Sequence, residues 1–300
     1  MSALAVEHAY RYAAPSQAIK GSDGMSVQMA TSGSLGNPGA RPYFFQGSLN
    51  RPRPCALALR VLSGLVGARF YTPPATKARA LRLADPLVTC AGGLLRFEGF
   101  STCCGAYGRV DLSEAAFRGL VVRQGTTNVD FNAPMRAALS QIRDHESVGF
   151  AIGADEVTLL RGADQVIERK VALPARWIKG LIETGAFQAR MKLAFTVQKI
   201  EATRFIKSLP KATSPRTKSW VGLSGPVLRV MQVASKTAVP ISGIERLRVV
   251  EELAPYILSM RIYSDPVEGA TAWEFDLGGL TFTLVLSPEV WRGFSGEGQA

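Results

Sequence analysis

The sequence predicts an α+β fold with largely antiparallel sheets and single interspersed helices. Short strand-like runs follow one another with only glycine or polar turns between them, which is typical of meanders. Helical patterns occur singly, without the regular strand–helix alternation of a parallel sheet. The last two strand patterns flank Gly278-Gly279, a two-residue hairpin turn. With 300 residues, 47% of them hydrophobic, the chain is long enough to bury a substantial core.

The N-terminal part of the chain is predicted to be a flexible arm over residues 1–40. Its second half, 14–40, is rich in Gly, Ser and Pro around one short strand candidate, 25–30. Apolar residues then recur at helical spacing over 53–71, and the prolines that begin at Pro73 end this helix.

The middle of the chain is predicted to alternate strand groups with single helices. Strands are expected over 94–100, 106–112, 119–124 and 127–132. Pro134 marks the first turn of a helix, because proline is favoured at that position. A three-stranded meander is expected over 147–153, 156–162 and 165–173.

Pro174 opens the next predicted helix. Its apolar stripe consists of Trp177, Ile178, Leu181, Ile182 and Gly185. The remaining elements are expected to be a strand over 191–200, a helix over 201–209, strands over 220–225 and 226–233, a helix over 243–257, a strand over 258–264 and the hairpin over 273–286.

The predicted organisation is an arm (1–40), a main α+β domain (41–209) and a second α+β subdomain or continuation (220–300). Residues 210–219 are the best linker candidate, since they combine Pro, Ser, Thr and Lys without apolar periodicity. No internal repeat is evident. The chain start lacks the pattern of a signal peptide and no segment resembles a membrane span, so we expect a soluble, cytoplasmic protein.

Net charge is +11, and the basic residues are concentrated in two segments, 41–84 and 161–218. Such segments indicate a surface for nucleic acid or for an acidic partner protein, or a solvated face. The candidate contact residues are Arg51, Arg53, Lys77, Arg79, Lys207, Lys211, Arg216 and Lys218.

Two of the four cysteines, Cys103 and Cys104, are adjacent and precede Gly105. A cysteine nucleophile needs a base, and the sequence has only His8 and His145. Tetrahedral zinc needs two close-spaced ligand pairs, which are absent. A vicinal disulfide requires strain and an oxidising compartment. The favoured interpretation is a structural pair, with one thiol packed as a small hydrophobe and the other at a tight turn at Gly105.

Other catalytic and cofactor motifs are missing from the sequence. It contains neither the GxxxxGK[ST] phosphate loop nor a GxGxxG turn after a strand. The paired carboxylates Asp155-Glu156 and Glu251-Glu252 are best explained as solvated charge. We therefore expect no catalytic, cofactor-binding or metal-binding residue in this chain and no enzymatic activity, with a cryptic cysteine enzyme as the least favoured alternative.

Several long phrases resemble the N-terminal region of bacterial SWIM zinc finger family proteins. The phrases are YFFQGSL (43–49), ARFYTPPA (68–75), ADPLVT (84–89), LRFEGFSTCCGAYGRVDL (95–112), GTTNVDFNAPMRAAL (125–139), ERKVALPARWIKG (168–180) and FTLVLSPEVWRGFSGEG (282–298). The resemblance implies a partnership with a MoxR-type AAA+ ATPase and a von Willebrand factor A protein. It also implies zinc binding, but only by the SWIM zinc finger that gives the family its name.

The finger itself, Cys-x-Cys followed by Cys-x-His, has no counterpart in these 300 residues. No zinc ligand is therefore assigned here. The function expected from residues and resemblance together is a non-enzymatic adaptor or interaction module. Direct nucleic-acid binding through the two basic segments is the alternative, and strong salt dependence would distinguish it.

Overall fold

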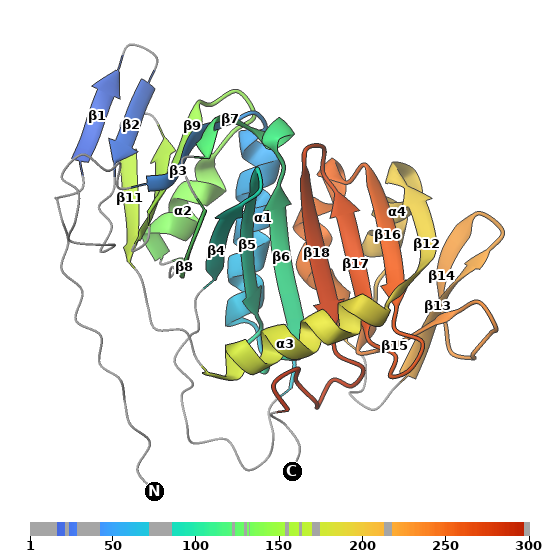
Figure 1. Cartoon of the computed structure of the whole chain (residues 1–300). Helices are drawn as coiled ribbons and strands as arrows, with labels where there is room; N and C mark the ends of the chain where they lie inside the picture. Colours follow the sequence, from blue (N-terminus) through green and yellow to red (C-terminus); the bar gives the residue numbers. More distant parts are fainter. Residues whose placement is uncertain are drawn as a thin grey trace, which may run out of the picture.

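An eight-stranded antiparallel sheet dominates the fold, with strand order β12–β16–β17–β18–β6–β5–β4–β8 (Figure 1). A five-stranded sheet (β11–β10–β9–β3–β7), a three-stranded sheet (β14–β13–β15) and the hairpin β1–β2 complete it. The computed structural model describes residues 17–21, 24–28, 43–71, 86–121, 124–128, 131, 133–153, 156–161, 164–169, 175–212 and 218–296. Every strand pair in these residues is antiparallel, which confirms the predicted α+β class.

The helices are α1 (Pro52–Gly67), α2 (Ala133–Gln141), α3 (Ala175–Arg190) and α4 (Lys199–Lys207), with the 3₁₀ helices η2 (Glu114–Ala116) and η3 (Ile244–Tyr256). The strands of the first half are β1 (Gln17–Gly21), β2 (Gly24–Gln28), β3 (Tyr43–Leu49), β4 (Leu87–Ala91), β5 (Leu94–Phe100), β6 (Ala106–Leu112), β7 (Phe117–Val121), β8 (Gly125–Asn128), β9 (Val148–Gly153), β10 (Glu156–Arg161) and β11 (Asp164–Arg169). Those of the second half are β12 (Lys192–Gln198), β13 (Lys218–Ser224), β14 (Val227–Met231), β15 (Val239–Ser242), β16 (Ser259–Ser264), β17 (Thr271–Asp276) and β18 (Leu280–Leu286).

The two halves of the chain repeat one order of elements, a feature that the sequence does not reveal. With η2 set aside, the first half runs β3–α1–β4–β5–β6–β7–β8–α2–β9–β10–β11 and the second runs β12–α4–β13–β14–β15–η3–β16–β17–β18. Corresponding strands pair alike: β3–β9 matches β12–β16, β4–β5 matches β13–β14, and β4–β8 matches β13–β15. In the described residues, the second half has no counterpart of β6 and β7.

Even the irregularities of the two halves correspond. The β3–β9 register shifts between Tyr43 and Phe45, and the β12–β16 register shifts between Leu193 and Phe195. The bulge follows the first residue of β3 and the second residue of β12, so it lies near the start of both strands. A bulge bends its strand and increases the local twist, so its recurrence near the start of both strands is a geometric signature of the repeat.

The halves join edge to edge, where β18 pairs with β6 from Leu280↔Leu112 to Leu286↔Ala106. The repeat boundary therefore falls at α3, and the predicted linker 210–219 lies inside the second half, where its last two residues begin β13. Because one sheet crosses the junction, the repeat does not divide the chain into separate domains, and the predicted domain limits stay a prediction.

Helix α1 packs closely on one face of the large sheet because two glycines face it. Gly99 and Gly108 are opposite each other on β5 and β6. A Cβ at Gly108 would lie 2.4 Å from a methyl carbon of Leu65, and a Cβ at Gly99 would lie 2.7 Å from one of Val66. Only glycine allows this approach of helix to sheet. We refer to this side of the sheet as the inner face and to the opposite side as the outer face.

The C-terminal hairpin forms as predicted. Gly278 and Gly279 have φ values of 80° and 82°, as a two-residue turn of this kind requires, and Leu277 N–H donates to the Leu280 carbonyl. Its arms contribute fully buried Phe275 and Phe282 to the core, where Phe205 of α4 stacks on Trp273 at 5.8 Å between ring centroids.

Two expectations differ from the structure. The helix expected over 243–257 is a 3₁₀ helix, η3, with Pro255 near its end. The residues predicted as a flexible arm contain the β1–β2 hairpin, which extends the single strand candidate at 25–30 to two paired strands.

Candidate functional site

The Cys103–Cys104 pair lies in the turn between β5 and β6 and holds the C-terminal segment in place. Cys104 is buried and has a φ of 51°, the one positive φ of a non-glycine residue in the described part of the chain. Its carbonyl accepts a hydrogen bond from Phe294 N–H (2.8 Å), and the Gly105 carbonyl accepts one from Ser287 N–H (3.1 Å). The left-handed residue is thus Cys104, not Gly105, where the sequence predicts the tight turn.

Arg246 on η3 is hydrogen-bonded to the same turn. Its guanidinium is completely buried and donates to the carbonyls of Gly105 (2.7 Å), Ser242 (2.6 Å), Ser287 (2.9 Å) and Gly243 (3.3 Å), and to the Ser287 hydroxyl (3.1 Å). Burial lowers the pKa of Arg246 to about 10, so the side chain is still a cation at neutral pH. All N–H donors of the guanidinium are hydrogen-bonded, so Arg246 has a structural role: it links these segments.

The arginines that flank the pair in sequence are directed elsewhere, whereas the buried Arg246 guanidinium interacts electrostatically with Cys103. Arg96 and Arg109 project from the outer face, where each has its Nε close to a carboxylate oxygen of Asp111, at 2.6 Å and 2.7 Å. His145 is exposed in the loop after α2. His8 lies outside the described residues.

The other two thiols are held protonated, and the described residues form no metal cluster. Burial raises the pKa of Cys55 to about 12 and also raises that of Cys90. No group of three or more His, Cys, Asp or Glu within the described residues is placed to hold a metal ion.

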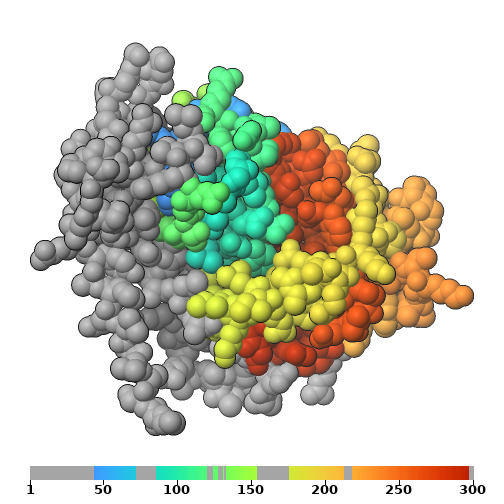
Figure 2. Space-filling model, in the orientation of Figure 1, coloured from blue at the N-terminus to red at the C-terminus, as the bar shows by residue number. Residues whose placement is uncertain are grey.

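Helix α3 crosses the outer face of the eight-stranded sheet (Figure 2). Beneath it, Phe100, Tyr107 and Val285 form an apolar row on neighbouring strands, and Trp177 and Phe187 pack down onto this cluster. The Phe100 ring lies 5.6 Å from Trp177 and 6.2 Å from Phe294 between centroids. Phe294 belongs to the segment fastened by the cysteine turn, so the turn indirectly supports α3.

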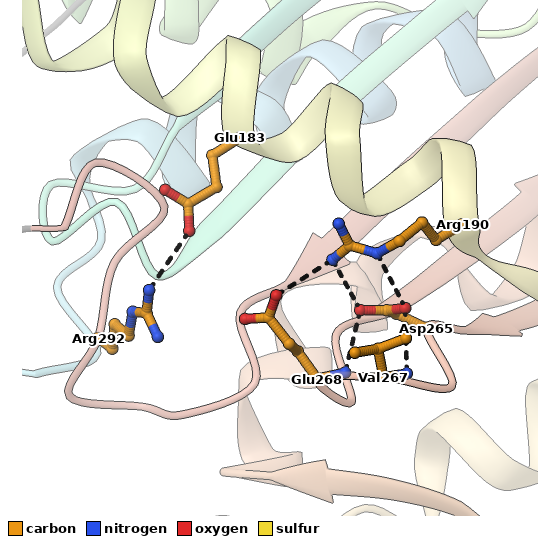
Figure 3. A network of polar contacts seen from close by, with 6 residues as sticks. All are labelled: Glu183, Arg190, Asp265, Val267, Glu268 and Arg292. Carbon is orange, nitrogen blue, oxygen red and sulfur yellow. Dashed lines mark hydrogen bonds and ion pairs between the residues drawn. The ribbon is translucent and has the colours of Figure 1, made fainter.

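Ion pairs fix both α3 and the turn after β16 (Figure 3). Arg190 donates to the two carboxylate oxygens of Asp265 at 3.1 and 3.4 Å, and also pairs with Glu268. The Asp265 side chain is fully buried and accepts the backbone N–H groups of Val267 and Glu268. Burial alone would raise the pKa of Asp265, but Arg190 and these N–H groups outweigh it and lower the pKa.

The opposite side of α3 carries apolar side chains into solvent. Ile178 is 50% exposed and Ile182 is 70% exposed, one helical turn apart. Gly185 follows on this side, and a Cβ there would meet no atom within 4 Å. We refer to Ile178, Ile182 and Gly185 as the α3 ridge. The predicted apolar stripe is therefore split, since Trp177 is buried and Leu181 partly buried against the sheet while the ridge is exposed.

The part of the outer face that α3 does not cover carries charged side chains that form ion pairs with one another. Arg96 and Arg109 share Asp111, and Arg261 pairs with Glu274 at 3.1 Å. Because opposite charges lie on adjacent strands, this part of the face presents little net charge to a partner.

Two of the predicted nucleic-acid or partner contacts have internal roles. Arg51, at the start of α1, donates to the carbonyl of Leu277 in the C-terminal hairpin turn. Arg53 donates to the carbonyl of Ile142 at 2.7 Å, which fastens α1 to the end of α2. Both guanidiniums stabilise the fold where they lie.

The remaining described candidates are distributed around the second half. Lys207 and Lys211 are exposed at the end of α4, and Lys218 on β13 pairs with Glu289 at 3.3 Å. Lys77, Arg79 and Arg216 lie outside the described residues.

Sequence reasoning missed three residues that organise this region: Arg246, Asp265 and Phe294. Arg246 is one of five charged residues on η3, so the local pattern does not distinguish it as buried. The pairing of Arg190 with Asp265 joins residues 75 positions apart, for which a single sequence gives no signal.

No protein-family model matches the sequence, and no curated protein matches it. The resemblance to SWIM zinc finger proteins thus stays a prediction. None of the described helices is sufficiently long and apolar to cross a membrane.

Solved structures of sliding clamps share the fold. Proliferating cellular nuclear antigen from Entamoeba histolytica superimposes with a TM-score of 0.53 and 9% identity, over 82% of this chain and 99% of that one. The antigen of A. fulgidus, solved with the bound C-terminal region of FEN-1, gives a TM-score of 0.51 and 11% identity, over 81% of this chain and 97% of that one. At these identities the similarity shows the fold alone.

Proposed function

We propose that this chain is a non-enzymatic interaction module that presents the α3 ridge to a partner protein. The observation that carries the proposal is a firmly anchored helix with exposed isoleucines: Trp177 and Phe187 are buried beneath α3, whereas Ile178 and Ile182 face solvent. Apolar side chains held rigidly at a surface bind a partner without a large cost in conformational entropy. The paired charges around α3 would then form the rim of the interface.

The chemistry of the buried groups supports interaction over catalysis. Arg246 is saturated by carbonyls, and the Tyr107 hydroxyl donates to Glu98 beneath α3. Burial, and then the Glu98 charge, raise the pKa of Tyr107 well above its ordinary value, so this phenol stays neutral. These strongly perturbed groups have structural partners.

The partners in this proposal come from the family resemblance: a MoxR-type AAA+ ATPase and a von Willebrand factor A protein. The fold is compatible with such a role, since the clamp of A. fulgidus was solved with a segment of a protein partner bound. Arg51 and Arg53, two of the candidates for nucleic-acid contact, are engaged internally, which favours protein partners over nucleic acid.

The test is a binding titration of the purified chain against each of the two partner proteins from its own host. The double variant Ile178→Lys/Ile182→Lys should lose binding at least about tenfold, because two apolar contacts become charged. Lys179→Gln, on the same helix beside the ridge, is the matched control and should bind like the unchanged chain. Full affinity in the double variant would contradict the proposal, provided that its melting temperature shows an intact fold.

A further inference from the structure

The structural repeat identifies a strand position that is filled in the first half and empty in the second. In the first half, β3 lies between β9 and β7, with β7 paired from Phe45↔Val121 to Leu49↔Phe117. Its counterpart β12 pairs with β16 on one side, and no described strand pairs with its other edge. Where the first half has β6, η2 and β7, the second has only residues 232–238 between β14 and β15.

At the neighbouring edge, that of β14, side chains bond to the backbone of Leu228. Leu228 N–H donates to the Glu201 carboxylate, and the Leu228 carbonyl accepts from Arg204, which also pairs with Glu201. These α4 residues satisfy the backbone that the missing counterpart of β6 would satisfy. An edge strand with unpaired backbone groups is a template for another strand, and β12 is such an edge strand.

The sequence segment that begins with β12 is strongly basic. Residues 191–238 contain nine Lys or Arg and one carboxylate, Glu201, which Arg204 occupies. Among the described residues of this segment, the exposed cations are Lys192, Lys199, Arg204, Lys207, Lys211, Lys218, Arg229 and Lys236, of which Arg204 pairs with Glu201 and Lys218 with Glu289. Lys192 begins β12 and Lys199 directly follows it, so two copies of β12 would repel one another, whereas an acidic strand would be attracted.

We propose that the β12 edge binds an extended, acidic segment of a partner protein as an added strand, in the position that β7 holds in the first half. Main-chain hydrogen bonds to β12 supply affinity, and carboxylates opposite Lys192 and Lys199 supply selectivity. On the side of the sheet that faces solvent, Leu193 (54% exposed) and the exposed Thr196 and Gln198 lie beside the added strand. The inference rests on the proposed interaction role but uses a surface other than the α3 ridge.

A fluorescein-labelled peptide of alternating acidic and valine residues, Glu-Val-Asp-Val-Glu-Val-Asp, tests the proposal with the full 300-residue chain. Two further versions carry N-methyl groups on the odd or on the even residues. In a strand only one of these sets of N–H groups faces the neighbouring strand. One N-methylated version should therefore lose binding and the other should keep it. Retention by both versions, or no binding of the parent peptide, would overturn the proposal.

Charge variants locate the binding and separate it from nucleic-acid binding. Lys192→Glu/Lys199→Glu should weaken the parent peptide about tenfold, as the loss of two exposed ion pairs allows. Lys207→Glu, an exposed lysine of α4 away from β12, should leave affinity within about twofold.

A single-stranded oligonucleotide of equal charge should bind more weakly than the peptide, and tighter binding of the oligonucleotide would overturn the proposal. Ile178→Lys/Ile182→Lys should bind the peptide normally, so failure at one surface is distinguishable from failure at the other.

Discussion

At the scale of single residues, the guanidinium of Arg246 connects three segments that are distant in sequence: the start of β6, the β15–η3 turn and the end of β18. Arg246→Met should lower the free energy of unfolding by about 3 kcal/mol or more, because buried carbonyls lose their donors. Urea unfolding measures it. The free energy of unfolding of Arg246→Lys should lie between those of the unchanged chain and Arg246→Met, since an ammonium cannot reproduce the planar hydrogen-bonding geometry of a guanidinium. A decrease of less than about 1 kcal/mol in the free energy of unfolding of Arg246→Met would contradict this structural role of Arg246.

The cysteines give a second test at this scale. Cys55, Cys90 and Cys104 are buried and Cys103 is partly exposed. In a timed thiol titration of the folded chain, Cys103 should react first, and the other three should react only at the rate of unfolding. Near-stoichiometric zinc by elemental analysis, or fast modification of Cys104, would contradict the structural role of the pair.

Single-residue roles were only partly predictable from sequence. The lack of a base and of ligand spacing led to a structural interpretation of Cys103–Cys104, and the structure places them in a turn. The left-handed conformation at Cys104 was hidden, because glycine is the residue that usually adopts it and Gly105 stands beside it. The buried Arg246 was missed for a related reason: arginine is seldom buried, so composition indicates a surface position.

At the scale of the elements, α3 offers a matched pair of glycines. A Cβ at Gly180 would lie 2.9 Å from the Phe100 ring, which is fully buried between other aromatic rings, whereas a Cβ at Gly185 would meet nothing. Gly180→Ala should therefore destabilise the protein, and Gly185→Ala should stabilise it by about 0.5–1 kcal/mol through helix propensity. Thermal melting of both variants checks this, and equal shifts would show that α3 does not rest on Phe100.

The anchor of α3 also predicts acid sensitivity. The pKa of Asp265 is lowered from 3.8 in the folded state, because Arg190 and two backbone N–H groups outweigh the effect of burial. Its contribution to stability is therefore present above pH 3.8 and is lost as the pH falls through the folded-state pKa. As the pH falls below 3.8, the unchanged chain should lose more stability than Asp265→Asn. If the unchanged chain and Asp265→Asn lost stability equally, the Asp265 carboxylate would be excluded as a source of the acid sensitivity.

Most elements were predictable because their local patterns are strong. Apolar residues recur at helical spacing along α1, and the Gly278-Gly279 turn gives the last hairpin. The orientation of α3 was not predictable, because its sequence is apolar on two sides. Which side is buried depends on Phe100 and Phe294, which come from distant parts of the chain.

At the scale of the whole molecule, the main finding is the repeat that joins β6 to β18 in one sheet. Its two halves share strand pairing and a bulge near the start of the first strand but no evident sequence repeat. A fold constrains the apolar pattern of each strand more than residue identity, so equivalent strands diverge while their pairing persists. The antiparallel α+β class was therefore predictable, whereas the repeat and the empty position beside β12 required the structure.

The central claim is that the α3 ridge binds a protein, and site-specific photo-cross-linking in the native host tests it most directly. A photo-reactive residue replaces Ile182 in one variant and Glu252, exposed on η3 with the inner-face elements, in a control. The account predicts a discrete protein adduct at position 182 that the control lacks and that Ile178→Lys abolishes. No adduct at 182, equal adducts at both positions, or cross-linking to nucleic acid at 182 would contradict it.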